Sequence, residues 1–175
     1  MKRAVFLDKD GVLNKVIIRN GRIGSPRSLP EMELREEAAE SINELKRGGF
    51  LVVVLTNQPD IARGKMSFSE FEIMAATIRE RLSIDDILVC PHDDEDGCEC
   101  RKPKPGLIKR ASEQHGIDIL GSFFVGDTGR DMKAASQAGC LGLLIDTPYN
   151  QDVPCLHRFR NLRDAVKFIL EKGDG

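Results

Sequence analysis

Two aspartates near the amino terminus, Asp8 and Asp10, directly follow a short apolar run, residues 4–7. Such a run is typical of a buried strand in a parallel sheet, and these sheets place their chemistry beyond the carboxyl ends of the strands. Asp127 follows a second apolar run, residues 122–125. Carboxylates from two strand ends suit Mg²⁺, which prefers a few carboxylates together with water and phosphate. The sequence therefore indicates a Mg²⁺ site where these strands end.

Two further polar residues, Thr56 and Asn57, follow another apolar run, residues 50–55. Lys102 follows a cysteine-rich loop. Together with the aspartates they form a set suited to phosphoryl transfer. One carboxylate can attack phosphorus, and a second can protonate the leaving alcohol and then activate water. A metal ion and a lysine neutralise charge on the transferring group, while a hydroxyl and an amide donate hydrogen bonds to it.

Each of these residues alone has an ordinary alternative. Thr56 and Asn57 are also common turn formers. Lys102 alone is typical of a solvated surface charge, and Asp127 or Asp131 could cap a helix. Only the joint occurrence of these residues favours phosphoryl transfer.

A second group of residues has the spacing of a metal site. Cys90, His92, Cys98 and Cys100 offer three thiolates and one imidazole within eleven residues. A Cys₃His set is typical of tetrahedral zinc, and four protein ligands indicate a structural site. The alternatives are two core cysteines with an exposed histidine, or iron in place of zinc. Bound zinc would stiffen this acidic loop and help to aim Arg101, which follows it directly.

Length and composition limit the class of protein. The chain has 175 residues with 41% hydrophobic and 31% charged residues, which predicts a single globular domain spanning residues 1–175. The net charge of −2 gives no reason to expect a nucleic-acid partner. No apolar run approaches the length that spans a membrane, and no signal peptide is evident. We expect a cytoplasmic monomer.

Strand-like and helix-like segments alternate along the chain, which favours an α/β fold: a three-layer, Rossmann-like parallel sheet with helices on both faces. Residues 14–30, punctuated by glycine and proline, are expected to be a loop. Ser67 and Glu70 form a capping box at the start of a helix, and Pro105 is expected at the first position of another. The expected strands are residues 4–7, 50–55, 84–90, 122–125 and 141–145.

The acidic motifs, in their order along the chain, resemble those of the haloacid dehalogenase superfamily of aspartate-nucleophile phosphatases. The resemblance implies that Asp8 is the nucleophile and a Mg²⁺ ligand. It implies that Asp10 is the general acid/base, with its backbone carbonyl on the metal. Asp127 matches a further Mg²⁺ ligand, and Asp131 matches an acid lying just behind the metal site.

The same resemblance assigns the remaining polar residues. Thr56 and Asn57 match the motif that holds the phosphoryl group, and Lys102 matches the lysine of the third motif.

Longer segments, residues 8–14, 56–64 and 100–106 with the zinc loop, resemble one subfamily. It contains D-glycero-D-manno-heptose 1,7-bisphosphate phosphatase and the histidinol-phosphate phosphatases, which lack a large cap domain. The resemblance implies a capless, Mg²⁺-dependent phosphomonoesterase that forms an aspartyl phosphate and removes the C7 phosphate of a heptose bisphosphate, a small phosphorylated sugar. Alternatives are a histidinol-phosphate or other small-metabolite phosphatase, and a catalytically silent, zinc-stabilised binding module.

Arg63 and Arg101 are candidates for binding the rest of the substrate, since a guanidinium suits a second phosphate. The chain also departs from the subfamily pattern. Thr128 stands where bisphosphatases often carry a lysine, and Arg130 is a candidate to replace its charge.

Overall fold

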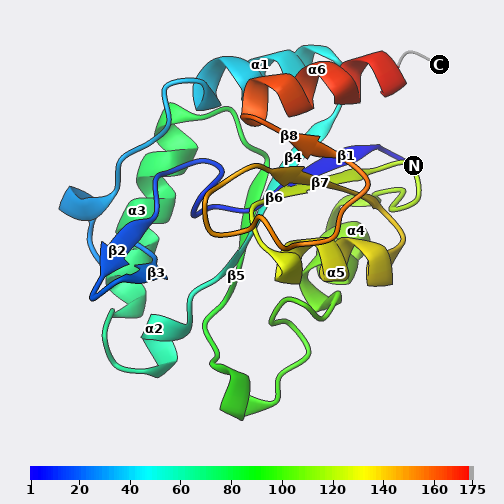
Figure 1. The fold of residues 1–175 in the computed structure, drawn as a ribbon. Coiled ribbons are helices and arrows are strands. Elements are labelled where there is room, and N and C mark those ends of the chain that lie inside the picture. The colour runs from blue at the N-terminus through cyan, green and yellow to red at the C-terminus, as the bar shows by residue number, and fades with distance from the viewer. Residues whose placement is uncertain (174–175) are drawn as a thin grey trace.

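Six parallel strands form the central sheet of the computed structural model, which describes residues 1–173 (Figure 1). Because strands that are adjacent in the sheet are distant in sequence, helices connect most of them. In their order across the sheet the strands are β5 (Asp86–Cys90), β4 (Leu51–Asn57), β1 (Ala4–Leu7), β6 (Phe123–Gly126), β7 (Leu141–Ile145) and β8 (Arg158–Phe159).

Helices cover both faces of this sheet, as the alternating pattern predicts. One hydrophobic core lies under α1 (Ala38–Arg47), α3 (Phe68–Arg81) and α6 (Leu162–Gly173). The other lies under α4 (Gly106–His115) and α5 (Gly129–Ala138). In Figure 1, α1 and α6 lie side by side above the sheet, with α4 and α5 below it. The expected three-layer α/β fold is thus confirmed.

Strand β1 is central and completely buried, which makes it the reference for the site. Val5 and Leu7 point into one core, and Ala4 and Phe6 into the other, so successive side chains alternate between the two faces. The strand pairs with β4 on one side and β6 on the other. The carboxyl ends of these three strands therefore meet at one edge of the sheet.

The expectation of a loop over residues 14–30 was wrong. Two short antiparallel strands, β2 (Ile17–Arg19) and β3 (Arg22–Gly24), form a hairpin there. Asn20 and Gly21 connect them with φ angles of 51° and 71°. Asn-Gly is the preferred pair for a two-residue hairpin turn, which needs positive φ at both positions. The hairpin is followed by a short 3-10 helix, Leu29–Glu31.

Other boundaries differ by a few residues. Strand β4 continues through Thr56 and Asn57, which were expected to follow it. Pro105 is the residue before α4 and not its first residue. A one-turn helix, α2 (Pro59–Ala62), follows β4, while the Ser67–Glu70 capping box of α3 is confirmed.

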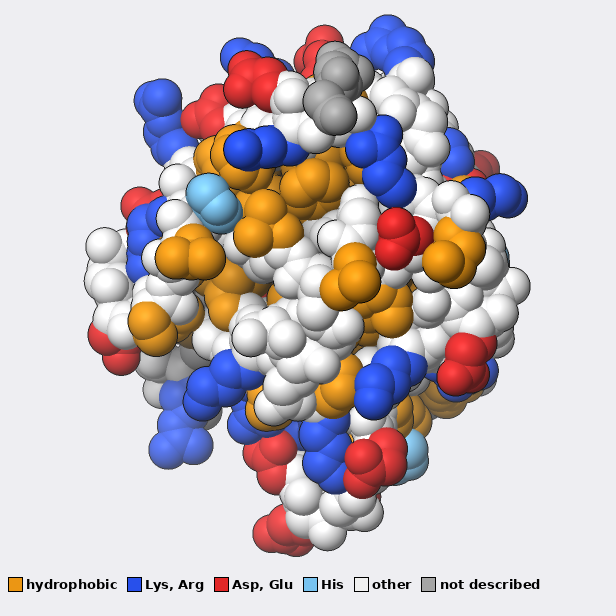
Figure 2. All heavy atoms as spheres, turned by 90° about the vertical axis from the view of Figure 1, so that its right-hand side faces the viewer, with side chains coloured by type: hydrophobic (Ala, Val, Ile, Leu, Met, Phe, Trp, Pro, Cys, Tyr) orange, Lys and Arg blue, Asp and Glu red, His pale blue; other side chains and the backbone are white. Residues whose placement is uncertain are grey.

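The opposite edge of the sheet, where β1 begins, faces the viewer in Figure 2. Hydrophobic side chains lie there between basic and acidic ones, away from the strand ends that carry the aspartates. Over residues 1–173, no helix is both long and apolar enough to cross a membrane.

Candidate active site

A cleft opens at the carboxyl ends of β1, β4 and β6, where the sequence predicts a site. The hairpin forms one wall, and the segment directly after the cysteine-rich loop forms part of another. The cleft is lined by Asp8, Asp10, Val16, Ile23, Gly24, Ser25, Asn57, Pro59, Arg101, Lys102, Asp127, Thr128, Arg130 and Asp131. Thus Asp8, Asp10, Asn57, Arg101, Lys102, Asp127 and Asp131 all converge here, as predicted from sequence.

Lys102 joins two carboxylates at the bottom of this cleft. Its Nζ lies 2.9 Å from Oδ1 of Asp8 and 2.7 Å from Oδ1 of Asp131, and it donates a third bond of 2.8 Å to the Leu55 carbonyl. The side chain is 3% exposed. All three ammonium protons therefore have acceptors. Burial lowers the pKa of Lys102, but the charges of Asp131 and Asp8 outweigh burial and raise this pKa above its ordinary value. The lysine stays charged.

Asn57 holds the backbone of Lys102 in place. Its side-chain oxygen accepts from the Lys102 N–H at 3.1 Å, and its side-chain nitrogen donates to the Lys102 carbonyl at 3.0 Å. This paired contact connects the end of β4 to the segment after the cysteine-rich loop. Thr56 is fully buried and accepts a hydrogen bond of 2.9 Å from Gln58, so its hydroxyl lies behind the cleft wall.

Three carboxylates crowd one side of the cleft. Asp8, Asp127 and Asp131 can each place an oxygen within 4.8 Å of the others. Burial, followed by the charge of Asp131, raises the pKa of Asp8 well above its ordinary value and that of Asp127 to about 6. Among the described residues, Oδ1 of Asp127 is buried without a hydrogen-bond partner. These oxygens form a donor set that fits a hard divalent cation.

The backbone at Gly11 passes close to the carboxylate of Asp127. Gly11 has a φ of 87°, and a Cβ at this position would collide with the Asp127 carboxylate. Only glycine therefore lets the chain turn after Asp10 and pass close to Asp127.

Asp127 is held from the far side by residues that sequence reasoning missed. The hydroxyl of Tyr149 donates to its Oδ2, and the Asn150 side chain donates to its backbone carbonyl at 2.8 Å. Tyr149 is the single tyrosine of the chain. Because Tyr149 lies 22 positions from Asp127 along the chain, no local sequence pattern could connect the two residues.

Asp10 lies beside Asp8 but belongs to a different network. Its Oδ1 accepts from Lys9 at 2.8 Å and from Asn14 at 3.0 Å, while its Oδ2 accepts from Gln58 at 2.9 Å. Burial raises its pKa, but the charge and hydrogen bond of Lys9, assisted by Asn14, outweigh burial and lower it. Asp10 is therefore ionised in the free protein, and Lys9, although fully buried, is its partner.

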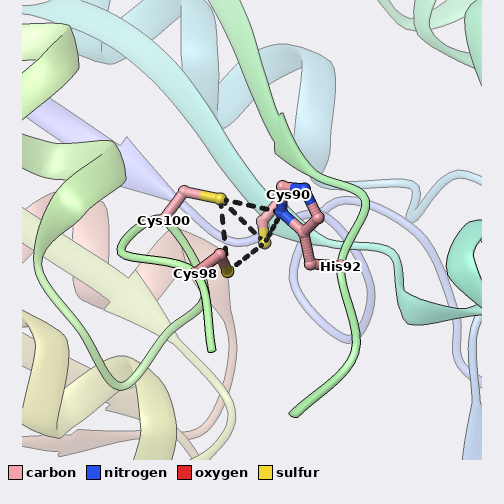
Figure 3. Close-up of side chains that lie close together, drawn as sticks. All are labelled: Cys90, His92, Cys98 and Cys100. Carbon is pink, nitrogen blue, oxygen red and sulfur yellow. Dashed lines mark hydrogen bonds between the residues drawn. The ribbon is translucent and has the colours of Figure 1, made fainter. Parts of the chain in front are cut away.

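Cys90, His92, Cys98 and Cys100 form a compact cluster (Figure 3). Their sulfurs lie 3.0 to 3.6 Å apart, and the Nδ1 of His92 is 3.4 Å from Cys100 and 3.6 Å from Cys90. A tetrahedral zinc ion with Zn–S bonds of about 2.3 Å would separate two sulfurs by roughly 3.8 Å. All five cysteines of the chain are free thiols, so no disulfide competes for these four positions. The set fits a structural zinc ion.

The two arginines proposed for substrate binding lie in different places. Arg101 lines the cleft, and its side chain is 11% exposed. Arg63 instead lines a neighbouring groove, where it pairs with Asp93 and, at 3.5 Å, with Asp60. Arg130, at the start of α5, lines the cleft as well.

Comparisons with known proteins agree with this geometry. The model of the family described as polynucleotide kinase 3 phosphatase matches residues 17–141. A Pseudomonas aeruginosa protein named D-glycero-beta-D-manno-heptose-1,7-bisphosphate 7-phosphatase is 37% identical over 148 residues, covering 82% of this chain and 80% of its own length. A Campylobacter jejuni protein, named as the 7-phosphatase of the alpha anomer, is 30% identical over 97% of both chains.

The solved structures similar to this chain also include a heptose 1,7-bisphosphate phosphatase. The D,D-heptose 1,7-bisphosphate phosphatase of B. bronchiseptica, complexed with magnesium and phosphate, is similar to this chain with a TM-score of 0.85 and 28% identity. The match covers 97% of this chain and 99% of that one.

The crowded carboxylates predict an unusual pH dependence of stability. The raised pKa of Asp127 means that the folded protein binds its proton more tightly than the unfolded chain does. The resulting stabilisation is complete below about pH 4, and it is lost as the pH rises through about 6. Asp127→Asn imitates the protonated form at every pH. In Mg²⁺-free buffer, its melting temperature should therefore rise relative to wild type by about 5 °C between pH 4 and pH 7.

Differential scanning calorimetry of the two proteins across this range checks the prediction. Asp152→Asn, at an exposed position without side-chain partners among the described residues, is the matched control and should show a constant offset. An offset for Asp127→Asn that does not change with pH would contradict the charge crowding.

Proposed function

Because this chain belongs to the heptose 1,7-bisphosphate 7-phosphatase family of the haloacid dehalogenase superfamily, we propose that it removes the C7 phosphate of D-glycero-D-manno-heptose 1,7-bisphosphate. The chain is a phosphatase and not a silent binding module. The observation that supports the mechanism best is Lys102, whose ammonium joins Asp8 and Asp131 at the bottom of a cleft.

In this proposal Asp8 is the nucleophile. Its Oδ1 accepts hydrogen bonds from the Lys9 N–H and from Lys102, which leaves Oδ2 to attack phosphorus. As the new bond between Oδ2 and phosphorus forms, the bond between phosphorus and the C7 oxygen breaks. The product of this step is an aspartyl phosphate on Asp8 and a free alcohol.

Asp10 moves the protons. It donates one to the departing C7 oxygen, and as a carboxylate it then takes one from the water that attacks the aspartyl phosphate. This second attack breaks the bond between phosphorus and Asp8 and releases inorganic phosphate. Asp10 is ionised in the free protein, and the arriving phosphate raises its pKa because like charges disfavour the ionised carboxyl.

The carboxylates of Asp8 and Asp127 and the backbone carbonyl of Asp10 would hold Mg²⁺. When bound, Mg²⁺ would offset the crowding of negative charge and stabilise the charge of the transferring group. The unpartnered Oδ1 of Asp127 supports this assignment. Asp131 contacts Lys102 instead, in agreement with a position behind the metal site.

The remaining residues position the phosphoryl group and the substrate. Lys102 neutralises charge on the transferring group, and the paired contacts of Asn57 orient it. Thr56 accepts a hydrogen bond from Gln58, which also donates to Asp10, so Thr56 helps to hold the proton-transferring carboxyl. Arg101 would bind the second phosphate of the substrate.

The charge of the cleft mouth supports a bisphosphate over histidinol phosphate. An ammonium group would need a free carboxylate at the mouth. No residue of the acidic run Asp93–Asp96 lines the cleft, whereas Arg101 and Arg130 do. The mouth therefore offers positive charge to a second anionic group.

We assign structural zinc to the cysteine cluster because four ligands close the coordination shell. The ion would fix the loop immediately before Arg101. A single zinc ion per chain is therefore expected in the purified protein. Cys98→Ser should lose it and lower the melting temperature by about 5 °C or more.

Elemental analysis and calorimetry measure both effects. Cys155→Ser, which changes a cysteine outside the cluster, should keep the zinc and the wild-type melting temperature. Zinc-free wild-type protein with an unchanged melting temperature would contradict a structural zinc site.

Phosphate release with Mg²⁺ tests the substrate. The panel contains both anomers of heptose 1,7-bisphosphate, fructose 1,6-bisphosphate and histidinol phosphate. We expect kcat/KM to be at least about tenfold higher for one heptose anomer than for the other substrates, because one anomer places its second phosphate at the arginine-lined mouth. Highest activity on histidinol phosphate, or no activity on any member, would contradict the heptose assignment.

A further inference from the structure

One carboxylate in the cysteine-rich loop contacts both arginines at the mouth of the cleft. Oδ1 of Asp94 accepts from Nε of Arg101 at 2.7 Å and from Nη1 of Arg130 at 2.9 Å, and its Oδ2 accepts from Nη2 of Arg130 at 3.2 Å. The three residues come from two segments of the chain, the loop and the start of α5. Asp94 therefore connects the loop to the start of α5.

The loop holds Asp94 in a defined conformation. Asp94 begins a short 3-10 helix that ends at Asp96, and the Asp93 and Asp96 side chains cap its start reciprocally. Gly97 ends it in the left-handed conformation, with a φ of 61°. The carboxylate of Asp94 thus projects from an ordered turn and not from a freely moving segment.

Asp94 contacts the arginines from outside the cleft. Arg101 and Arg130 both line the cleft, whereas Asp94 does not; it lines a second groove, which Arg101 also reaches, and is 59% exposed. Backbone carbonyls help to fix the same guanidinium groups: His92 accepts from Arg101 at 3.4 Å, and Lys102 accepts from Arg130 at 3.3 Å. The carboxylate therefore orients the two guanidinium groups without occupying the space for substrate.

We propose that Asp94 is a positioning residue for substrate specificity, which holds Arg101 and Arg130 ready to bind the second, non-reacting phosphate. This inference rests on the proposed function, because it requires a substrate with two phosphates. Arginine side chains are long, and the freedom that they lose on binding weakens affinity unless they are held in advance. Two fixed guanidinium groups also match the planar hydrogen-bonding demands of a phosphate dianion.

Arg130 takes on particular importance in this chain. Position 128, next to Asp127, is a threonine, and its hydroxyl is used within α5 by Asp131. The second positive charge at this side of the mouth therefore comes from Arg130, two positions further along the chain and the second residue of α5. Asp94 fixes this guanidinium through two hydrogen bonds.

Steady-state kinetics of Asp94→Asn test the proposal, with heptose 1,7-bisphosphate and heptose 7-phosphate as substrates. We expect the KM for the bisphosphate to rise about tenfold while kcat changes less than twofold. The ratio of the two kcat/KM values, bisphosphate over monophosphate, should fall by a similar factor. A merely structural role would lower kcat for both substrates together and leave this ratio unchanged.

Controls come from the same loop and from the partner residue. Glu95→Gln removes the neighbouring charge, which has no ion pair among residues 1–173, and should keep the wild-type ratio. Arg130→Gln, which lies outside the loop, should lower the ratio by itself. The double variant, Asp94→Asn with Arg130→Gln, should lower the ratio by a smaller factor than the product of the two single fold-changes.

The outcomes separate this inference from the proposed function. Wild-type protein without a preference for the bisphosphate would overturn both. A wild-type preference that survives in Asp94→Asn, or a KM that falls in this variant, would overturn the role of Asp94 alone. If Asp94→Asn does not fold, an unchanged ratio in Arg130→Gln overturns the role that the proposal gives to the arginine pair.

Discussion

The buried contact of Lys102 with Asp8 and Asp131 is the interaction on which the rest of this structure depends. Burying one charge without a partner is costly, and breaking a buried pair commonly costs about 3–5 kcal/mol because the other charge is left alone. Here three segments have to meet for the charges to be paired: the end of β1, the start of α5 and the segment after the cysteine-rich loop. The parallel sheet brings the first two together, and Asn57 at the end of β4 fixes the third.

The same constraint explains the shape of the cleft. Short elements form the walls: the β2–β3 hairpin on one side and the segment directly after the cysteine-rich loop on the other. Ile23, Gly24 and Ser25 come from the hairpin, while Arg101 comes directly after the cluster of Cys98 and Cys100. Such walls leave the cleft open enough for a small sugar phosphate, and they place basic side chains at its mouth.

Local patterns predicted much of this arrangement. The apolar run before Asp8, the cysteine and histidine spacing and the Ser67 capping box each depend on residues that are close in sequence. The hairpin also had such a signal, the Asn20–Gly21 pair, which was overlooked among the glycines and prolines of that segment. The alternation of strands and helices was sufficient to predict that separate strand ends would meet.

Contacts between distant segments could not be predicted in this way. The hydrogen bond from Tyr149 to Asp127, and the pairing of Asp94 with Arg130 across 36 positions, follow from how the segments pack together. Lys9 and Gln58 have no distinguishing pattern, although both hold Asp10. Arg63 shows the converse. A guanidinium suits a second phosphate, which suggested a place in the cleft, whereas its side chain reaches Asp93 in the next groove.

The proposed attack by Asp8 is tested most directly by a rapid-quench, single-turnover experiment with enzyme in excess over heptose 1,7-bisphosphate. Mass spectrometry of the quenched protein would locate any phosphoryl group along the chain. We predict a phosphoryl group on Asp8 that forms and decays as inorganic phosphate is released, and neither phosphorylation nor turnover in Asp8→Asn. Phosphate release by pure Asp8→Asn at the wild-type rate would contradict Asp8 as the nucleophile.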